Sequence, residues 1–171
     1  GLSWLGTFHS ICVKLLRKHA AAVNLNSNFT IIDTDDQIRL IKNICKAENI
    51  DVKQLGPRYV LAIIDKWKNK GHYPNEVVIN KKDIYEKTIL PVYKIYQQKL
   101  TDLNACDFGD LILHVVKILE KNDDIREIYS KNFKYILVDE YQDTNYIQSR
   151  WLSLLAQNNK NICCVGDDDQ S

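Results

Sequence analysis

The segment Tyr-Ile-Leu-Val-Asp-Glu, residues 135–140, constrains the fold more than any other part of the chain. Its apolar run shows no alternation with polar residues, which predicts a strand buried on both faces, as in a parallel sheet covered by helices. Asp139 and Glu140 follow directly at the carboxyl end of this strand. In open α/β sheets ligands bind at that edge. The segment therefore predicts an α/β fold with a site at the edge of its sheet.

A second apolar run, residues 162–165, repeats this arrangement and is followed by Gly-Asp-Asp-Asp-Gln at 166–170. A helical stripe lies between the two runs, which predicts a β-α-β unit with parallel strands. Its members are Ile147, Trp151, Leu154 and Leu155. A lone Asp-Glu pair after a strand is more often a solvated turn. Two acidic strand ends joined by one β-α-β unit favour a site instead.

Carboxylates gathered at one edge repel each other unless a cation lies among them. Magnesium is suited to this position, because it takes one or two carboxylates and completes its shell with water and substrate phosphates. A second carboxylate is then available to deprotonate water, as in nucleotide hydrolysis. In this scheme Gln170 contacts the terminal phosphate of the nucleotide.

The order of the predicted elements indicates an insertion into a parallel-sheet domain. Residues 1–23 are predicted to form a short strand, at 3–8, and then a helix. Residues 24–104 are predicted to be mainly helical after a short extended segment. The α/β pattern returns in residues 105–171. The predicted boundaries are thus after residue 23 and after residue 104.

Several residues mark the ends of the predicted helices. Thr34, with a glutamine three residues later, predicts a capping box. Pro57 suits the first turn of a helix and Gly71 suits its left-handed end. A helix over 82–103, with Tyr85 and Leu103 on its buried stripe, contains Pro91, which should kink or divide it. Asp107 is placed to cap the helix that follows it.

Some basic and aromatic residues have two interpretations. The lysines at 66, 68 and 70 are predicted to be a solvated helix end rather than a duplex-DNA clamp, although lysine–phosphate contacts are what DNA binding requires. Trp67 and Tyr96 lie on predicted buried stripes, so they are expected in the core rather than as platforms for base stacking.

Composition excludes few functions. With 23 Lys and Arg against 22 Asp and Glu, the net charge is +1, so a nucleic-acid partner requires a local basic patch. No apolar run approaches the roughly 20 residues needed to span a bilayer. The five cysteines are odd in number and form no C-x-x-C pair, which favours a reducing cytoplasm. A chain without methionine that begins at Gly1 is expected to be a piece of a longer protein.

Four motifs resemble, in order, those of the UvrD/Rep/PcrA group of superfamily-1 DNA helicases. They are GTFHS at 6–10, DFGDL at 107–111, VDEYQDTN at 138–145 and VGDDDQS at 165–171. The stretches FTIIDTDDQIRLIK and IYEKTILPVYKIYQQKL resemble subdomain 1B, the helical insertion into motor domain 1A of that family. The resemblance implies a RecA-like, parallel-sheet P-loop NTPase domain interrupted by a mostly helical insertion.

The resemblance also implies roles in ATP hydrolysis. Asp139 would bind the magnesium of MgATP, Glu140 would be the general base for the attacking water, and Gln170 would sense the γ-phosphate. The chain has no G-x-x-x-x-G-K-[ST] phosphate loop, which this chemistry requires. We therefore expect ATP and magnesium to bind the full-length protein, and residues 1–171 alone to be inactive.

The resemblance further implies contacts with DNA. Single-stranded DNA would be touched by Thr7, Phe8 and His9. Asp107 and Phe108 would belong to a further DNA-contacting segment. Two residues depart from the family pattern: Gly109 stands where an acidic residue is usual, and Pro91 is unusual in the long helix of the insertion.

The implied function is an ATP-dependent 3′–5′ DNA helicase that acts on single-stranded and duplex DNA in repair or replication restart, with repair or replication proteins as further partners. The isolated chain is expected to be a monomer without a membrane contact. Two alternatives stay open from the sequence. One is the helicase subunit of a helicase-nuclease. The other is a non-catalytic module that binds DNA or docks a partner, in which the acidic motifs no longer act.

Overall fold

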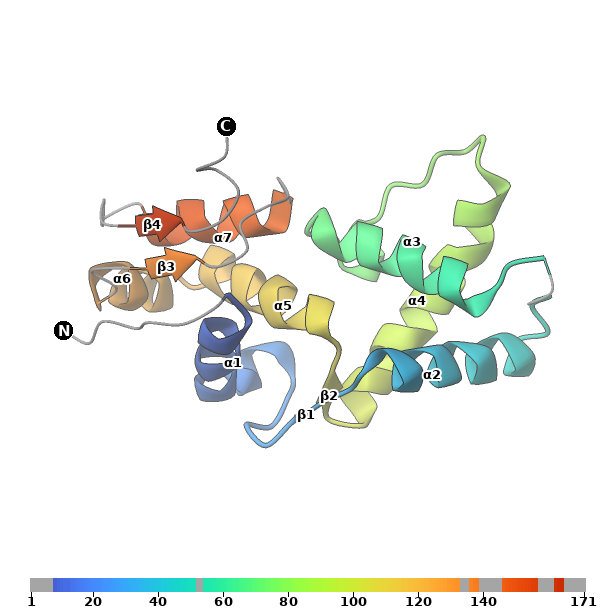
Figure 1. Cartoon of the computed structure of the whole chain (residues 1–171), viewed down its shortest axis with the longest axis horizontal. Helices are drawn as coiled ribbons and strands as arrows, with labels where there is room; N and C mark the ends of the chain where they lie inside the picture. The colour runs from blue at the N-terminus through green and yellow to red at the C-terminus, as the bar shows by residue number, and fades with distance from the viewer. Residues whose placement is uncertain (1–7, 52–53, 133–135, 139–145, 157–161, 165–171) are drawn as a thin grey trace. The chain divides into compact units, whose positions relative to one another are not determined.

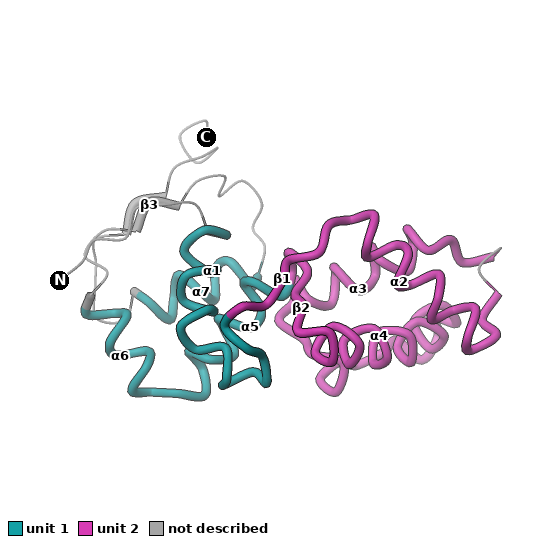
Figure 2. Tube along the Cα trace, turned by 90° about the horizontal axis from the view of Figure 1, so that it is seen from below, with its two compact units in different colours: residues 1–27, 110–171 teal, residues 28–109 magenta. Residues whose placement is uncertain are grey.

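A computed structural model of the chain describes residues 8–51, 54–132, 136–138, 146–156 and 162–164 (Figure 1). These residues are rich in helix and contain two small parallel strand pairs. The chain divides into two compact units, residues 1–27 with 110–171 (unit 1) and residues 28–109 (unit 2), coloured separately in Figure 2. The unit boundaries thus lie a few residues beyond the positions 23 and 104 expected from the sequence pattern.

Unit 2 is a group of helices closed by one strand pair. Its helices are α2 (Thr34–Ala47), α3 (Pro57–Asn69), the short 3-10 helix η2 (Pro74–Glu76) and α4 (Ile84–Asp102). The strands β1 (Thr30–Ile31) and β2 (Ala105–Cys106) are parallel, with Thr30 opposite Ala105 and Ile31 opposite Cys106. The segments that enter and leave the helical unit therefore lie side by side.

Local sequence signals explain most helix ends in unit 2. Pro57 is the first residue of α3, and Gly71 beyond its end has φ 81°, the left-handed conformation that glycine adopts without strain. The cap of α2 is Asp33, one residue before the predicted Thr34, and its side chain accepts a hydrogen bond of 2.9 Å from the Asp36 N–H. Aspartate and threonine both suit this position, so their order alone did not distinguish them.

Pro91 lies inside α4, which is a single helix from residue 84 to residue 102, so of the two predicted effects, a kink or a division, the division does not occur. A proline removes one hydrogen bond from a helix interior. Its neighbours Ile89, Val92 and Tyr93 are fully buried in the core of unit 2. Packing on both sides of the proline therefore holds the helix together across the missing bond.

The core of unit 2 is formed by the inner faces of α2, α3 and α4. It includes Ile41, Ile44, Val60, Ile64, Trp67, Ile89, Val92, Tyr93, Tyr96 and Leu100. The predicted burial of Trp67 and Tyr96 is confirmed. Tyr85 and Leu103, also expected on the buried stripe, are 50% and 66% exposed. They lie at the two ends of α4, where the helix pattern extends beyond the core.

Unit 1 contains the remaining elements. They are α1 (Phe8–Lys18), the 3-10 helix η1 (Ala20–Val23), α5 (Phe108–Lys121, from Asp110 onward), α6 (Asp123–Asn132), β3 (Ile136–Val138), α7 (Tyr146–Ala156) and β4 (Ile162–Cys164). Of the strand predicted at 3–8, residues 3–7 lie outside the described residues, and Phe8 already belongs to α1. Helix α6 was not predicted. Among the described residues, no helix has both the length and the apolar character needed to cross a membrane.

The packing of unit 2 predicts a large difference between two isoleucines. Ile64 is 0% exposed and Ile84 is 75% exposed, and both lie in helices of this unit. Ile64→Ala should lower the free energy of unfolding of unit 2 by about 2–5 kcal/mol, because it leaves a cavity in the core. Ile84→Ala should change it by less than about 0.5 kcal/mol. Hydrogen exchange of the slowest amides in residues 34–102 measures both; equal effects would show that the core is not where the structure has it.

Candidate functional site

The first candidate site is the edge of the β3–β4 pair. The two strands are parallel, with Ile136 opposite Ile162 and Val138 opposite Cys164. This confirms the predicted pairing and places both carboxyl ends at one edge. Asp139 and Glu140 are the next residues after β3, and the GDDDQ sequence at 166–170 follows β4 after one further residue. Carboxylate oxygens are the donors that magnesium prefers, so the residue types at this edge fit that ion.

The side chains assigned to nucleotide chemistry, Asp139, Glu140 and Gln170, lie outside the described residues. The same holds for Thr7 and for the side chain of Phe8, whose backbone begins α1. His9 is described and is exposed in the first turn of that helix. The roles of these residues in catalysis and DNA contact therefore stay predictions.

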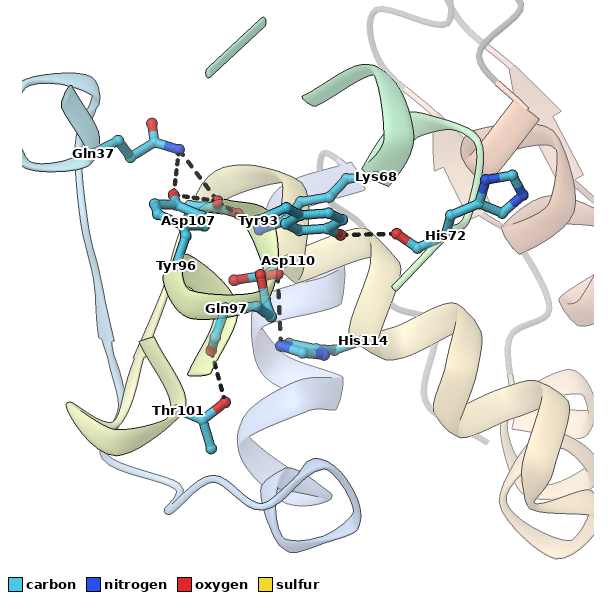
Figure 3. A network of polar contacts seen from close by, with 10 residues as sticks. All are labelled: Gln37, Lys68, His72, Tyr93, Tyr96, Gln97, Thr101, Asp107, Asp110 and His114. Carbon is cyan, nitrogen blue, oxygen red and sulfur yellow. Dashed lines mark hydrogen bonds and ion pairs between the residues drawn. The ribbon is translucent and has the colours of Figure 1, made fainter. Parts of the chain in front are cut away.

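The second candidate site surrounds Asp107, the residue between β2 and α5 (Figure 3). Its side chain is 0% exposed, and Oδ2 accepts three bonds: 2.6 Å from Lys68 Nζ, 2.7 Å from the Tyr96 hydroxyl and 3.2 Å from Gln37 Nε2. Gln37 Nε2 also donates to the Tyr96 oxygen at 3.0 Å. The three donors come from α3, α4 and α2. One carboxylate oxygen therefore joins all three long helices of unit 2.

Lys68 is the positive partner in this network and its side chain is 0% exposed. Its Nζ lies 5.1 Å from the ring centroid of Tyr96 and 5.8 Å from that of Tyr93. Aromatic faces attract a cation, and the attraction grows when water is excluded. Trp67 in turn stacks on Tyr93, with 5.6 Å between the two ring centroids. The ammonium is thus compensated by a carboxylate and by two ring faces.

The interpretation of the lysine run as a solvated helix end is wrong for Lys68, although Lys66 and Lys70 are exposed. A signal was present in the sequence. Lys68 lies four residues after Ile64 and eight after Val60, on the stripe that α3 buries. A lysine at a buried stripe position requires a carboxylate partner, because a charge is rarely buried alone. The sequence did not indicate which of the many acidic residues this partner is.

The residues after Asp107 differ sharply in exposure. Phe108 is 54% exposed, whereas the Asp107 carboxylate faces the helices of unit 2 and not solvent. A Cβ atom added at Gly109 would lie 3.1 Å from Lys68 Cδ and 3.5 Å from Asp107 Oδ1. Glycine at this position therefore coincides with close packing of the lysine stem. Contact with DNA through this segment stays a prediction, and Phe108 is the member of the predicted pair that is exposed.

Three described cysteines, Cys12, Cys45 and Cys106, are buried and form no disulfide. Burial raises the pKa of the Cys12 thiol far above its usual range and raises that of Cys45 as well. A thiol that resists ionisation is a poor nucleophile and a poor metal ligand. Cys12 and Cys45 therefore act as small apolar core residues.

Comparison with known proteins agrees with the motifs. The family model for the UvrD/REP helicase N-terminal domain matches residues 2–171, so the chain belongs to this family. It is 43% identical over 170 residues to a probable DNA helicase II homolog of Rickettsia conorii, covering 98% of this chain and 26% of that protein. It is also 43% identical over 168 residues to the ATP-dependent DNA helicase PcrA of Staphylococcus epidermidis, covering 98% of this chain and 23% of that protein. The chain thus spans about a quarter of the length of these relatives.

The buried network predicts that Asp107→Asn destabilises unit 2 strongly. The amide leaves Lys68 buried without its counter-charge, and breaking a buried ion pair from one side costs about 3–5 kcal/mol. Asp102→Asn is the matched control, because Asp102 is exposed and its bond to Gln98 is a surface contact. Hydrogen exchange of the amides in α2, α3 and α4 gives the free energy of opening for each variant. Similar small decreases in the free energy of opening for Asp107→Asn and Asp102→Asn would mean that the Asp107–Lys68 pair is not essential to the packing.

Proposed function

We propose that the chain is part of an ATP-dependent DNA helicase that translocates 3′ to 5′ on single-stranded DNA and unwinds duplex DNA in repair or replication restart. Membership of the UvrD/REP helicase family supports the class. The observation that carries the proposal is the parallel register of β3 and β4, because each strand runs toward an acidic motif at the same edge. Nucleotide hydrolysis in P-loop proteins uses an edge of this kind.

In this proposal unit 1 is part of a RecA-like motor domain 1A and unit 2 is the 1B insertion. The chain passes from residues 1–27 into unit 2 and returns at residue 110, as an insertion requires. The mainly helical content of unit 2 and the parallel strands of unit 1 support the assignment. Connections between parallel strands need a crossover, which α7 supplies between β3 and β4.

The chemistry follows from the residue types at the β3–β4 edge. Asp139 would hold the magnesium of MgATP, which when bound offsets the negative charge of the phosphates. Glu140 takes the proton of the attacking water as general base, and Gln170 senses the γ-phosphate through its amide. Residues 1–171 contain no phosphate loop, so we expect ATP and magnesium to bind the full-length protein and not this stretch alone.

In this proposal the other two motifs, at 6–10 and 107–111, contact DNA. Thr7, Phe8 and His9 contact the single strand, and His9 is exposed in agreement with this role. Phe108 presents an exposed aromatic ring in the DFGDL segment, where a base can stack on it. We further propose that the full-length protein acts in the cytoplasm together with repair or replication proteins, and that residues 1–171 alone are monomeric. The buried cysteines described above form no disulfide, which is compatible with a reducing compartment.

The proposal predicts that Glu140→Gln in the full-length protein abolishes ATP turnover while nucleotide binding persists. The amide removes the base and leaves the metal ligand Asp139 in place, so turnover should fall by about 10²-fold or more. ATP turnover with and without single-stranded DNA, beside a nucleotide-binding assay, gives both quantities. Glu127→Gln is the control, since Glu127 is exposed on α6.

Strong stimulation of the parent protein by DNA, lost only in Glu140→Gln, is the expected result. Equal loss of nucleotide binding and turnover would contradict the role of Glu140 as base. A full-length protein that binds DNA but turns over no ATP, with or without the substitution, would overturn the helicase function and favour a non-catalytic DNA-binding module.

A further inference from the structure

We propose that Lys68 is a positioning residue for the DNA-contacting segment: it holds the residues on both sides of Phe108 and so fixes the exposed ring at the start of α5. The inference rests on the proposed function, because it takes the DFGDL segment to contact single-stranded DNA. It adds a residue of the helical insertion, outside all four helicase motifs, to the determinants of DNA affinity.

The first step is the fixed position of Asp107. Its Oδ2 is bonded from Lys68, Tyr96 and Gln37, which come from three helices, so the oxygen is located by three separate anchors. A buried ion pair contributes little net stability compared with apolar residues of similar volume. The role of the pair here is to fix the position of the Asp107 side chain. A carboxylate with three donors has one allowed position, whereas an apolar side chain has several.

The second step is the backbone on which Asp107 lies. The strand before it is paired with β1, and the Ile32 N–H donates to the Cys106 carbonyl at 2.8 Å. Asp107 is therefore held through its backbone neighbour as well as through its side chain. Phe108 is the next residue and the first of α5, so its Cα has little freedom to move relative to unit 2.

The third step is the packing on the far side of Phe108. The stem of Lys68 passes the backbone of Gly109 so closely that an added Cβ would lie 3.1 Å from its Cδ. The ammonium of the same lysine bonds Asp107 at 2.6 Å. One side chain thus bonds the residue before Phe108 and occupies the space beside Gly109, the residue after it. The 54% exposed ring between them is presented in a defined direction.

Lys68 does not act as a phosphate ligand in this scheme. Its side chain is 0% exposed, whereas Lys66 in α3 and Lys70 just beyond the end of α3 are exposed. A lysine that contacts phosphate contributes to the salt dependence of DNA binding. A lysine that acts through Asp107 changes the affinity and leaves the salt dependence unaltered.

The test uses the full-length protein and a fluorescent oligo-deoxythymidine. Lys68→Met, Phe108→Ala and the double variant are compared with Lys66→Met and Lys70→Met, which remove the same charge from exposed positions. The dissociation constant is measured by anisotropy at several salt concentrations. The DNA-stimulated ATP turnover gives the DNA concentration for half-maximal rate and the rate at saturating DNA.

We expect Phe108→Ala to weaken DNA binding by roughly 5- to 100-fold, the effect of losing one stacked base. Lys68→Met should weaken it by a similar factor, with an unchanged salt slope and a retained rate at saturating DNA. The double variant should be no weaker than the weaker single variant, because both substitutions remove the same contact. The Lys66 and Lys70 variants should stay within about twofold of the parent, as expected for surface substitutions.

Because Lys68→Met leaves a buried carboxylate, Lys68→Met with Asp107→Leu provides a second variant whose core is apolar and can fold. It should keep the weakened DNA binding, since the anchor is absent. Parent-like affinity in this folded variant, beside a weakened Phe108→Ala, would overturn the role of Lys68 and leave the helicase function intact. Additive losses in the Lys68–Phe108 double variant would overturn it too. A parent protein that binds no single-stranded DNA would overturn the proposed function itself.

Discussion

The buried contact between Lys68 and Asp107 is the interaction that most constrains how the helical unit is assembled. Removing two charges from water costs several kcal/mol for each ion, so the pair persists only where other groups compensate. Tyr96 and Gln37 supply hydrogen bonds to the carboxylate, and two ring faces surround the ammonium. These groups come from all three long helices of unit 2. The chain can therefore bury the pair only when those helices have assembled around the segment that leaves the unit.

The two parallel strand pairs follow the same topological rule, although the connections between their strands differ greatly in length. Between β3 and β4 the connection is the single helix α7 with its flanking loops. Between β1 and β2 the connection is residues 32–104, which make up almost the whole of unit 2. Parallel strands always need a crossover, and nothing limits the crossover to one helix. An insertion of this size is thus compatible with a short strand pair at its base, which brings its two ends together.

The sequence predicted the elements whose signals are local. Uniform apolar runs indicated the β3–β4 pair, and Pro57 and Gly71 marked both ends of α3. Three features were missed or predicted wrongly. Helix α6 has only Ile125, Ile128 and Tyr129 at helical spacing within a short polar segment. Pro91 stays inside α4, where its neighbours are buried, and Lys68 lies on the buried stripe of α3 within a run of lysines that suggested a solvated helix end. The stripe indicated that Lys68 is buried, but local pattern does not identify its distant partner. The same limit applied to Asp107, whose partners are 70, 39 and 11 residues away.

The packing around Gly109 gives this glycine a physical meaning. The space that a Cβ would need lies against the Lys68 stem, so the glycine and the buried lysine fit together as a pair. The position lies in the first turn of α5, where glycine is a poorer helix former than alanine by up to about 1 kcal/mol. That cost is offset if the close approach lets the ammonium reach Asp107 without strain. Gly109 then makes room for the Lys68 stem next to the exposed Phe108 ring.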